Sequence, residues 1–374
     1  MILHDPAFAM NFPDYGILIP VLDSRATTVL ENLASGPRAG HTGRTRLIEG
    51  LEGAARLLGE DRAALAITRA DLARVHERGY VERLFGDGGA GDRGLEAALL
   101  STYELLDASG RPNRYESERA VKPLSALFST ILAQVTGTYA AGRLALAGGG
   151  RDGPGFCYYL GGGMHHARRD GGSGFCPVND IMIASARLRA EGRVSLVWII
   201  DVDAHKGDGT AEIARSFRAL GDPFALTLSA HMASGWPLDA ASIERARMEG
   251  RAAEKAPLAP SDVDIAIAPG EEAEYLPRLR EGLAELERLS DGRAADLAIV
   301  VDGADTYELD GLPSSAEMAL SLGACVERDL SILDFLDGRC IPSAWLMAGG
   351  YGERAWEPPA AFLNSIVRHR SSAD

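Results

Sequence analysis

Hydrophobic positions recur with two different spacings along the chain. Between about residues 25 and 146 they repeat at intervals of three and four, which predicts helices over 45–58, 69–84 and 124–146. From residue 155 onward, short apolar runs rich in β-branched and aromatic residues alternate with helical stretches. The predicted strands are 156–160, 195–201, 224–229, 263–268, 297–302 and 343–348. The predicted helices between them are 178–191, 210–220, 272–289 and 314–336.

Strands that alternate with helices are typical of a central parallel sheet flanked by helices on both faces. The glycine-rich stretches 148–155 and 161–174 are too short to separate domains, and the chain has no long linker. We therefore expect one α/β domain over residues 1–374. In such sheets ligands bind beyond the carboxyl ends of the strands, so catalytic residues should directly follow strands.

Four polar clusters meet this condition, each directly after a different predicted strand. They are His165 with His166, the segment 201–208, Asp302 with Asp305, and Tyr351. Packing alone does not account for ionisable groups at the ends of four separate strands. The sequence therefore predicts a site at this edge of the sheet.

The segment after residue 200 has the pattern of a metal site. Asp201, Asp203 and His205 alternate at the end of a strand, so their side chains point to the same side. Close carboxylates repel each other unless a cation neutralises them, and an adjacent imidazole favours a transition metal over calcium. Zn²⁺ accepts both ligand types, and Asp305 is the candidate third ligand. The alternative for so short a motif is that Asp201 and Asp203 cap the following helix.

His165 and His166 are candidate acid–base residues. A hydrolase that activates water needs a base near neutral pH, and histidine meets this need. Asp201 and Asp208 are available to orient the two imidazoles. Tyr351, between two glycines, would place a phenol where it could donate to an oxyanion. Taken singly, each histidine also fits an ordinary core or surface position, and the tyrosine also fits a turn.

Composition narrows the function further. The net charge of −15 argues against a nucleic-acid binder, because phosphate contact favours basic surfaces. No apolar run approaches the ~20 residues that span a bilayer, and no segment has the order of a signal peptide. The four cysteines form no C-x-x-C pair and are predicted to be buried thiols and not a disulfide framework. No G-x-S-x-G or H-E-x-x-H motif occurs. We expect a cytoplasmic enzyme that binds neither nucleic acid nor membrane.

At these residues the chain resembles the histone deacetylase superfamily, which includes bacterial deacetylase-like amidohydrolases and acetylpolyamine amidohydrolases. The similar motifs lie, in the family's order, at residues 162–167, 173–180, 201–209, 303–305 and 349–351. They extend over about residues 155–356, and a weaker match lies at residues 24–26. The resemblance implies the arginase–deacetylase fold, an α/β domain with a central parallel sheet.

The resemblance also assigns roles to the polar residues. It implies a Zn²⁺ site, with Fe²⁺ as an alternative ion, at Asp203, His205 and Asp305. It makes His165 and His166 a tandem pair oriented by Asp201 and Asp208 respectively. It makes Tyr351 the phenol that polarises the carbonyl group of the substrate. It further implies a structural K⁺ site at Asp201, Asp203, His205 and Ser229.

Four residues correspond to substrate-binding positions of the family: Phe175 and Gly174 on one wall of an acyl-lysine tunnel, Trp236 on the other wall, and Leu312. The chain departs from the family at Lys206, where a histidine is common, and at Ala230, where a leucine is common. Trp236 replaces the usual phenylalanine. Leu312 stands where eukaryotic polyamine-preferring members have a glutamate, which favours an acyl-lysine over a polyamine.

The resulting expectation is a metal-dependent amidohydrolase that removes an acetyl or related acyl group from a lysine-like amine. An acetylpolyamine or other small-amide amidohydrolase is the alternative within the same chemistry. A two-metal ureohydrolase would need more ligands around a second ion than the sequence offers near Asp305. A non-catalytic protein that binds acylated lysine would not need the proton-transfer groups that the motifs contain.

Overall fold

A computed structural model describes residues 1–35, 46–86, 91–107, 109–149, 153–238 and 258–369. Its centre is an eight-stranded sheet in which each adjacent pair is parallel, with strand order β2-β1-β3-β8-β7-β4-β5-β6. The strands are β1 (Ile2–His4), β2 (Leu47–Glu49), β3 (Phe156–Tyr159), β4 (Val197–Asp201), β5 (Ala225–Met232), β6 (Val263–Ile267), β7 (Leu297–Asp302) and β8 (Ser343–Met347).

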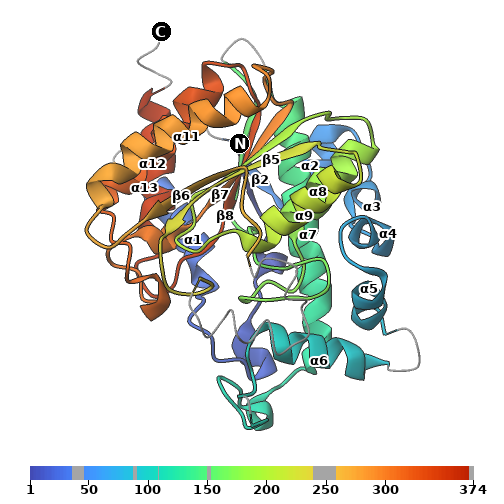
Figure 1. Ribbon diagram of the computed structural model, residues 1–374. Helices are drawn as coiled ribbons and strands as arrows, with labels where there is room; N and C mark the ends of the chain where they lie inside the picture. Colours follow the sequence, from blue (N-terminus) through green and yellow to red (C-terminus); the bar gives the residue numbers. More distant parts are fainter. Residues whose placement is uncertain (36–45, 87–90, 108, 150–152, 239–257, 370–374) are drawn as a thin grey trace.

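Helices cover both faces of this sheet (Figure 1). One layer consists of α1 (Ser24–Ser35), α11 (Tyr275–Leu289), α12 (Leu322–Asp337) and α13 (Glu357–His369). The other layer includes α2 (Gly50–Leu58), α7 (Leu127–Ala147), α8 (Asp180–Ala190) and α9 (Asp208–Ala219). The shorter helices α3 (Arg62–Leu65), α4 (Arg69–Ala73), α5 (Arg78–Leu84) and α6 (Asp92–Thr102) lie outside the second layer. The predicted parallel sheet with flanking helices is confirmed.

The sheet separates two hydrophobic cores. Val197 and Ile199 of β4 pack into the core beneath α7 and α8, whereas Trp198 and Ile200 pack into the core beneath α11 and α12. Successive side chains of a strand point to opposite faces, so a strand buried on both faces is apolar at every position. This explains why the central strands appear in the sequence as continuous apolar runs.

Several predicted boundaries were wrong. The helix predicted over 45–58 contains β2, and α2 follows it from Gly50, whose φ is +67°. The helix predicted over 69–84 is two helices, α4 and α5. The helix predicted from residue 314 starts only at Leu322, where the Ser321 hydroxyl accepts a hydrogen bond from the Ala324 N–H. β1 was not predicted.

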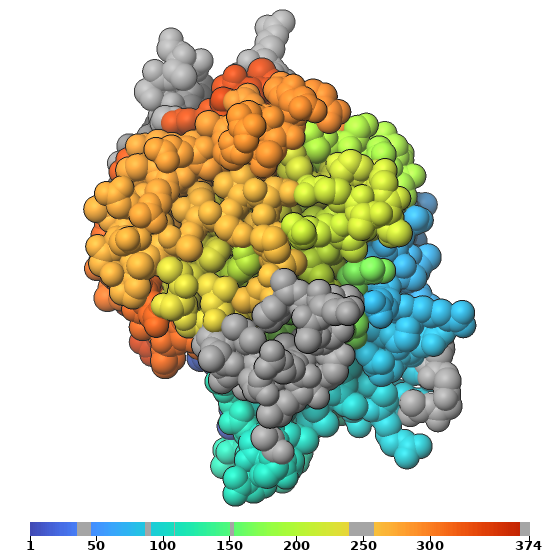
Figure 2. Space-filling view, in the orientation of Figure 1, coloured from blue at the N-terminus to red at the C-terminus, as the bar shows by residue number. Residues whose placement is uncertain are grey.

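Helix α6 and the chain that follows it project at the lower edge of the molecule in Figures 1 and 2. This projection contacts the carboxyl edge of the sheet, because the Phe175 N–H donates to the Thr102 carbonyl over 3.2 Å. Tyr103 stacks on the Phe175 ring, with centroids 6.5 Å apart. A peripheral element therefore shapes the site.

Among the described residues, none of the helices combines the length and apolar character that crossing a bilayer requires.

Candidate active site and metal centre

The four predicted clusters converge at the carboxyl edge of the sheet. His165 and His166 follow β3, residues 201–208 follow β4, Asp305 follows β7 and Tyr351 follows β8. β4, β7, β8 and β3 are neighbours in the sheet, which brings residues from positions 165 to 351 together. The position rule for parallel sheets therefore holds at each of these strands.

Asp203, His205 and Asp305 form a buried three-residue cluster whose candidate ligand atoms lie within 4.8 Å of one another. His205 Nδ1 lies 2.9 Å from Asp305 Oδ2 and 3.3 Å from Asp203 Oδ1. Its Nε2 lies 3.3 Å from the Ser314 hydroxyl. One imidazole nitrogen therefore faces both carboxylates while the other is held from behind, as in sites that bind a metal ion through histidine.

The charges in this cluster also favour a cation. Burial, and then the adjacent Asp203 carboxylate, raise the pKa of Asp305 to about 7. Burial disfavours the charged form of both carboxylates, and a divalent ion between them would stabilise that form. Two carboxylate oxygens and an imidazole are a donor set that Zn²⁺ accepts and that leaves room for a water molecule.

Glycine is required on two sides of the cluster. A Cβ atom on Gly349 would lie 2.3 Å from Asp203 Oδ2, and one on Gly303 would lie 2.6 Å from the same oxygen. The Gly349 N–H donates to this oxygen over 2.9 Å, and the Ala204 N–H donates to Asp305 Oδ1 over 3.0 Å. Backbone groups thus fix the carboxylates at a distance that a side chain would not permit.

The two histidines lie side by side, with ring centroids 3.9 Å apart. His165 Nδ1 lies 2.7 Å from Asp201 Oδ2, and His166 Nδ1 lies 2.9 Å from Asp208 Oδ1. Each Nδ1–H donates to a buried carboxylate, which directs each Nε2 away from its aspartate. His165 Nε2 lies 3.7 Å from Asp203 Oδ1, so this imidazole reaches the metal cluster. The pairing expected from the sequence is present.

The environments of the two imidazoles move their pKa values in opposite directions. Burial alone lowers the pKa of His165, but the Asp201 and Asp203 carboxylates outweigh it and raise this pKa to about 9. Burial, together with the His165 charge, lowers the pKa of His166 to about 3. Such divergence between neighbouring titratable groups is typical of acid–base pairs.

Side chains beneath the histidines hold their segment in place. Arg168 donates to Asp208 Oδ2 through Nε at 3.0 Å and Nη2 at 2.6 Å. Asp180 accepts from the Gly163 N–H at 3.0 Å and the Met164 N–H at 2.6 Å. His76 Nδ1 lies 2.8 Å from the Arg168 carbonyl. No role was predicted for Arg168 or His76, because the residues that they contact are distant in the sequence. Asp180 was noticed only as part of a motif.

Tyr351 lines the same cavity as the histidines. Its ring centroid is 6.5 Å from that of Phe175. Burial raises the pKa of the phenol well above its ordinary value, and the carboxylates of Asp305 and Asp203 raise it further. The hydroxyl therefore keeps its proton at neutral pH and remains a hydrogen-bond donor close to the metal cluster.

The predicted tunnel residues lie around this centre. The Trp236 ring is 4.4 Å from His166 and 5.6 Å from His205, measured between centroids. Gly174 has φ +54°, and a Cβ atom there would lie 2.2 Å from Trp236. The Arg114 guanidinium lies 5.5 Å from the centre of the Phe175 ring. Gly174 and Phe175 line the cavity.

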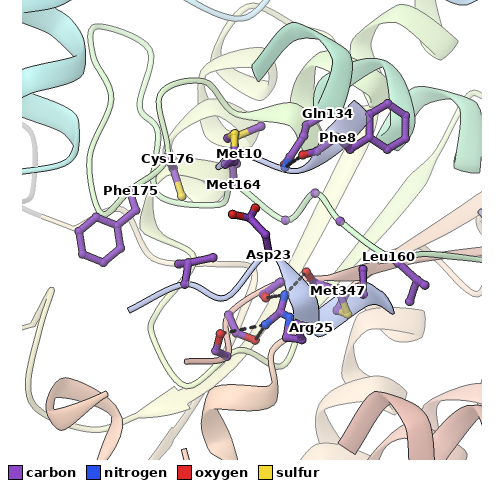
Figure 3. Close-up of a pocket in the computed structure, with 18 of the residues that line it drawn as sticks. Phe8, Met10, Asp23, Arg25, Gln134, Leu160, Met164, Phe175, Cys176 and Met347 are labelled. Carbon is purple, nitrogen blue, oxygen red and sulfur yellow. Dashed lines mark hydrogen bonds between the residues drawn. The ribbon is translucent and has the colours of Figure 1, made fainter. Parts of the chain in front are cut away.

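His165 and His166 line a cavity with a volume of about 170 Å³, and Figure 3 shows other residues of its wall. Most of its wall is apolar, with Phe8, Met10 and Met164 on one side. Arg25 lies at its base and donates to the carbonyls of residues 347–350 at 2.6–3.0 Å. Asp23 projects between these groups. The N-terminal segment thus forms a wall of the site.

Lys206 and Ser229 are placed next to the metal cluster by β4 and β5. Lys206 is buried, and its ammonium group pairs with Asp264 of β6. The Ser229 hydroxyl accepts from the Gly207 N–H over 3.3 Å. The positive charge at Lys206 is therefore neutralised by Asp264. Leu312, the fourth predicted substrate-binding residue, lies in the loop after Asp305, and its N–H donates to Asp310 over 2.9 Å.

Comparisons with known proteins agree with this geometry. A family model of the histone deacetylase domain matches residues 39–363. An uncharacterized protein of Picosynechococcus is 29% identical over 244 residues, which are 65% of this chain and 69% of that protein. Histone deacetylase 2 of Arabidopsis thaliana is 27% identical over 306 residues, which are 81% of this chain and 66% of that protein. The acetoin utilization protein AcuC of Staphylococcus aureus is 54% identical over 52 residues, 14% of this chain and 13% of that protein.

The crystal structure of acetylpolyamine aminohydrolase from Burkholderia pseudomallei matches 98% of both chains, with a TM-score of 0.62 and 20% identity. The fold is therefore the arginase–deacetylase fold. Fold and family match together define a hydrolase of the amidohydrolase class. The chain belongs to the histone deacetylase domain family.

Proposed function

We propose that this protein is a zinc-dependent hydrolase that removes an acetyl or related acyl group from a lysine-like amine. The observation that carries the proposal is the convergence of Asp203, His205 and Asp305 beside the histidine pair. The donor set fits Zn²⁺, with Fe²⁺ as the alternative ion. When bound, the ion would supply Lewis-acid polarisation and a lowered pKa for water.

Each nearby side chain has a part in this reaction. His165 accepts the proton of the water that attacks the amide carbonyl. The Tyr351 phenol donates a hydrogen bond to the oxyanion that forms. His166 delivers a proton to the departing amine, and Asp201 and Asp208 hold the two imidazoles in the required tautomer.

A cation at the cluster would also lower the pKa of His165 and raise that of His166, as these roles require. It would offset the Asp203 carboxylate, which is one of the charges that raise the pKa of His165. His165 would then move toward the neutral form that a base needs. Loss of the His165 charge would in turn allow the pKa of His166 to rise, because that charge lowers it.

The substrate class has one alternative. The structural neighbour from Burkholderia pseudomallei is named an acetylpolyamine aminohydrolase, which favours a small acylated amine as the second candidate. We favour an acyl-lysine because Leu312, in the loop after Asp305, offers no charge to a polyamine. The cavity wall is mostly apolar, and Asp23 is a carboxylate in it that could attract a second amine. Phe175 and Trp236 are the proposed walls for the alkyl chain of the amine. We place this reaction in the cytoplasm, with no role for nucleic acid or membrane.

The decisive experiment compares Tyr351→Phe with the wild-type enzyme on lysine peptides carrying short and long acyl groups and on acetylated polyamines. Loss of one oxyanion donor should lower kcat about 10²–10³-fold while bound zinc, measured by elemental analysis, is unchanged. Tyr307→Phe is the matched control, because the Tyr307 hydroxyl donates to Glu357 over 2.7 Å, away from the cluster. Equal turnover in Tyr351→Phe and wild type would remove Tyr351 from the mechanism.

Metal analysis tests the centre itself. Asp305→Ala should retain less than one tenth of the zinc bound by the wild type, because one of three ligands is lost. The proposed K⁺ site at Asp201, Asp203, His205 and Ser229 predicts that turnover differs between potassium and sodium buffers of equal ionic strength. A wild-type protein that binds no divalent ion would refute the proposed function.

A further inference from the structure

Tyr351 lies in a segment of backbone that has little stiffness of its own. Gly350 precedes it with φ +140°, and Gly352 follows it with φ +83°. Glycine reaches such values at little cost but also reaches many others, so two flanking glycines leave the intervening peptide free to rotate. Something outside the segment must therefore determine where the phenol points.

The loop after the third metal ligand restrains Tyr351 itself, whereas Arg25 holds the carbonyl of Gly350. Asp310 Oδ2 accepts a hydrogen bond from the Tyr351 N–H over 2.6 Å. The next residue, Gly311, donates its N–H to the Tyr351 carbonyl over 2.9 Å. Both backbone polar groups of Tyr351 are thus held by two consecutive residues. A bond from an N–H to a carboxylate is stronger than one between neutral groups.

Asp310 is itself fixed by further contacts. Its Oδ1 accepts from the Leu312 N–H at 2.9 Å and from the Ser315 hydroxyl at 3.0 Å. Its carboxylate is therefore fully engaged within the loop and against Tyr351. Three hydrogen-bond donors therefore hold the Asp310 side chain in one orientation, unlike an exposed acidic residue on the surface.

The same loop also contacts the metal cluster. It begins five residues after Asp305, and the hydroxyl of Ser314 lies 3.3 Å from His205 Nε2. This is the imidazole nitrogen opposite to the one that faces the carboxylates. Residues 310–315 therefore connect the phenol at one end to a metal ligand at the other.

We infer that Asp310 is a positioning residue that sets the Tyr351 phenol relative to the metal cluster. This inference rests on the proposed function, because Asp310 would contribute to catalysis only through Tyr351 as the oxyanion donor. Asp310 is not among the residues that line the cavity or among the three residues of the metal cluster. Its effect on catalysis passes through Tyr351, so the two residues should not act additively.

A double-mutant cycle tests the coupling. Asp310→Ala should lower kcat about 10–10²-fold with little change in KM and unchanged zinc, because a misplaced phenol weakens transition-state contacts more than substrate binding. In a Tyr351→Phe background the same substitution should cost less than about 3-fold. Asp296→Ala is the matched control, because Asp296 also accepts from backbone N–H groups, those of Ser195 at 2.6 Å and Leu196 at 3.0 Å, but at the amino ends of β4 and β7. It should stay near wild type.

Asp310→Asn serves where the alanine variant fails to fold, because its amide oxygen can still accept from the Tyr351 N–H. It should retain more activity than Asp310→Ala. Equal losses of kcat from Asp310→Ala in both backgrounds would overturn the inference, since they would show a general structural role.

Amide hydrogen exchange separates this inference from the proposed function. The peptide that contains Tyr351 should exchange at least about 10-fold faster in Asp310→Ala than in wild type, whereas peptides of β4 and β7 should not change. This result does not depend on turnover. A wild-type enzyme without activity would refute the proposed function. Hydrogen exchange at Tyr351 would still test whether Asp310 positions this residue. Unchanged exchange at Tyr351 would defeat the positioning role alone.

Discussion

His76 should make the stability of this protein fall steeply in weak acid. Its imidazole is buried between two backbone groups: Nδ1 donates to the Arg168 carbonyl over 2.8 Å, and Nε2 accepts from the Asn179 N–H over 3.1 Å. One donor and one acceptor fit only the neutral ring. Protonation would place a second N–H against the Asn179 N–H in a buried site.

The size of the effect follows from the pKa. Burial lowers the pKa of His76 from 6.5 to about 4. Between these two values the unfolded chain binds more protons than the folded one, so the free energy of unfolding decreases as pH falls. The contribution is complete above the unfolded pKa and is lost by the time pH reaches the folded one. A difference of 6.5 against about 4 corresponds to roughly 3 kcal/mol.

Urea unfolding at several pH values from about 7 to about 4, on wild type and His76→Gln, would measure this loss. His76→Gln should be less stable at neutral pH but should lose about 3 kcal/mol less on acidification. Comparing slopes cancels the titration of the carboxylates that both proteins share. Parallel curves for the two proteins would refute the reasoning and show that His76 is not held neutral.

Three further outcomes follow from other contacts. Arg328 is fully buried and donates to the carboxylates of Asp302 and Asp329. Arg328→Met should therefore lower the free energy of unfolding by about 3–5 kcal/mol in urea titrations. A loss under about 1 kcal/mol would contradict the buried pairing. Gly174→Ala should lower kcat/KM at least about 10-fold while zinc is retained, because the added Cβ would lie 2.2 Å from Trp236. Unchanged kinetics would show that the Trp236 side chain can move aside without loss of activity. Chelation of the metal should abolish turnover and lower the Tm, both recovering when zinc is restored.

The candidate site was predictable because its residues are close together within each motif. Asp203 and His205 are two apart in the segment directly after β4, and His165 and His166 are adjacent. Their patterns needed only the rule that parallel strands present their carboxyl ends at one edge. Asp305 was reached by the same rule, and it lies beside Asp203 and His205 in the structure.

The supporting residues were not predictable for a physical reason. Asp310 acts on the backbone of Tyr351, 41 residues away, and His76 acts on the backbone of Arg168, 92 residues away. Hydrogen bonds to backbone groups leave no mark on the sequence of the partner. The six strands from β3 to β8 were predicted because they are long apolar runs. β1 and β2 have three residues each, too few to show a period, and tertiary pairing alone forms them.

The strand order has a consequence for how the chain reaches its native state. β3 pairs with β8, so residue 156 must find residue 343 before the middle of the sheet can close. Contacts between segments so distant are slow to form, because the entropy of closing a large loop must be overcome first. Until then, the exposed edges of the early strands are open to pairing with other chains. Expression at low temperature, or with abundant chaperones, should therefore raise the yield of folded protein more than changes made at the site itself.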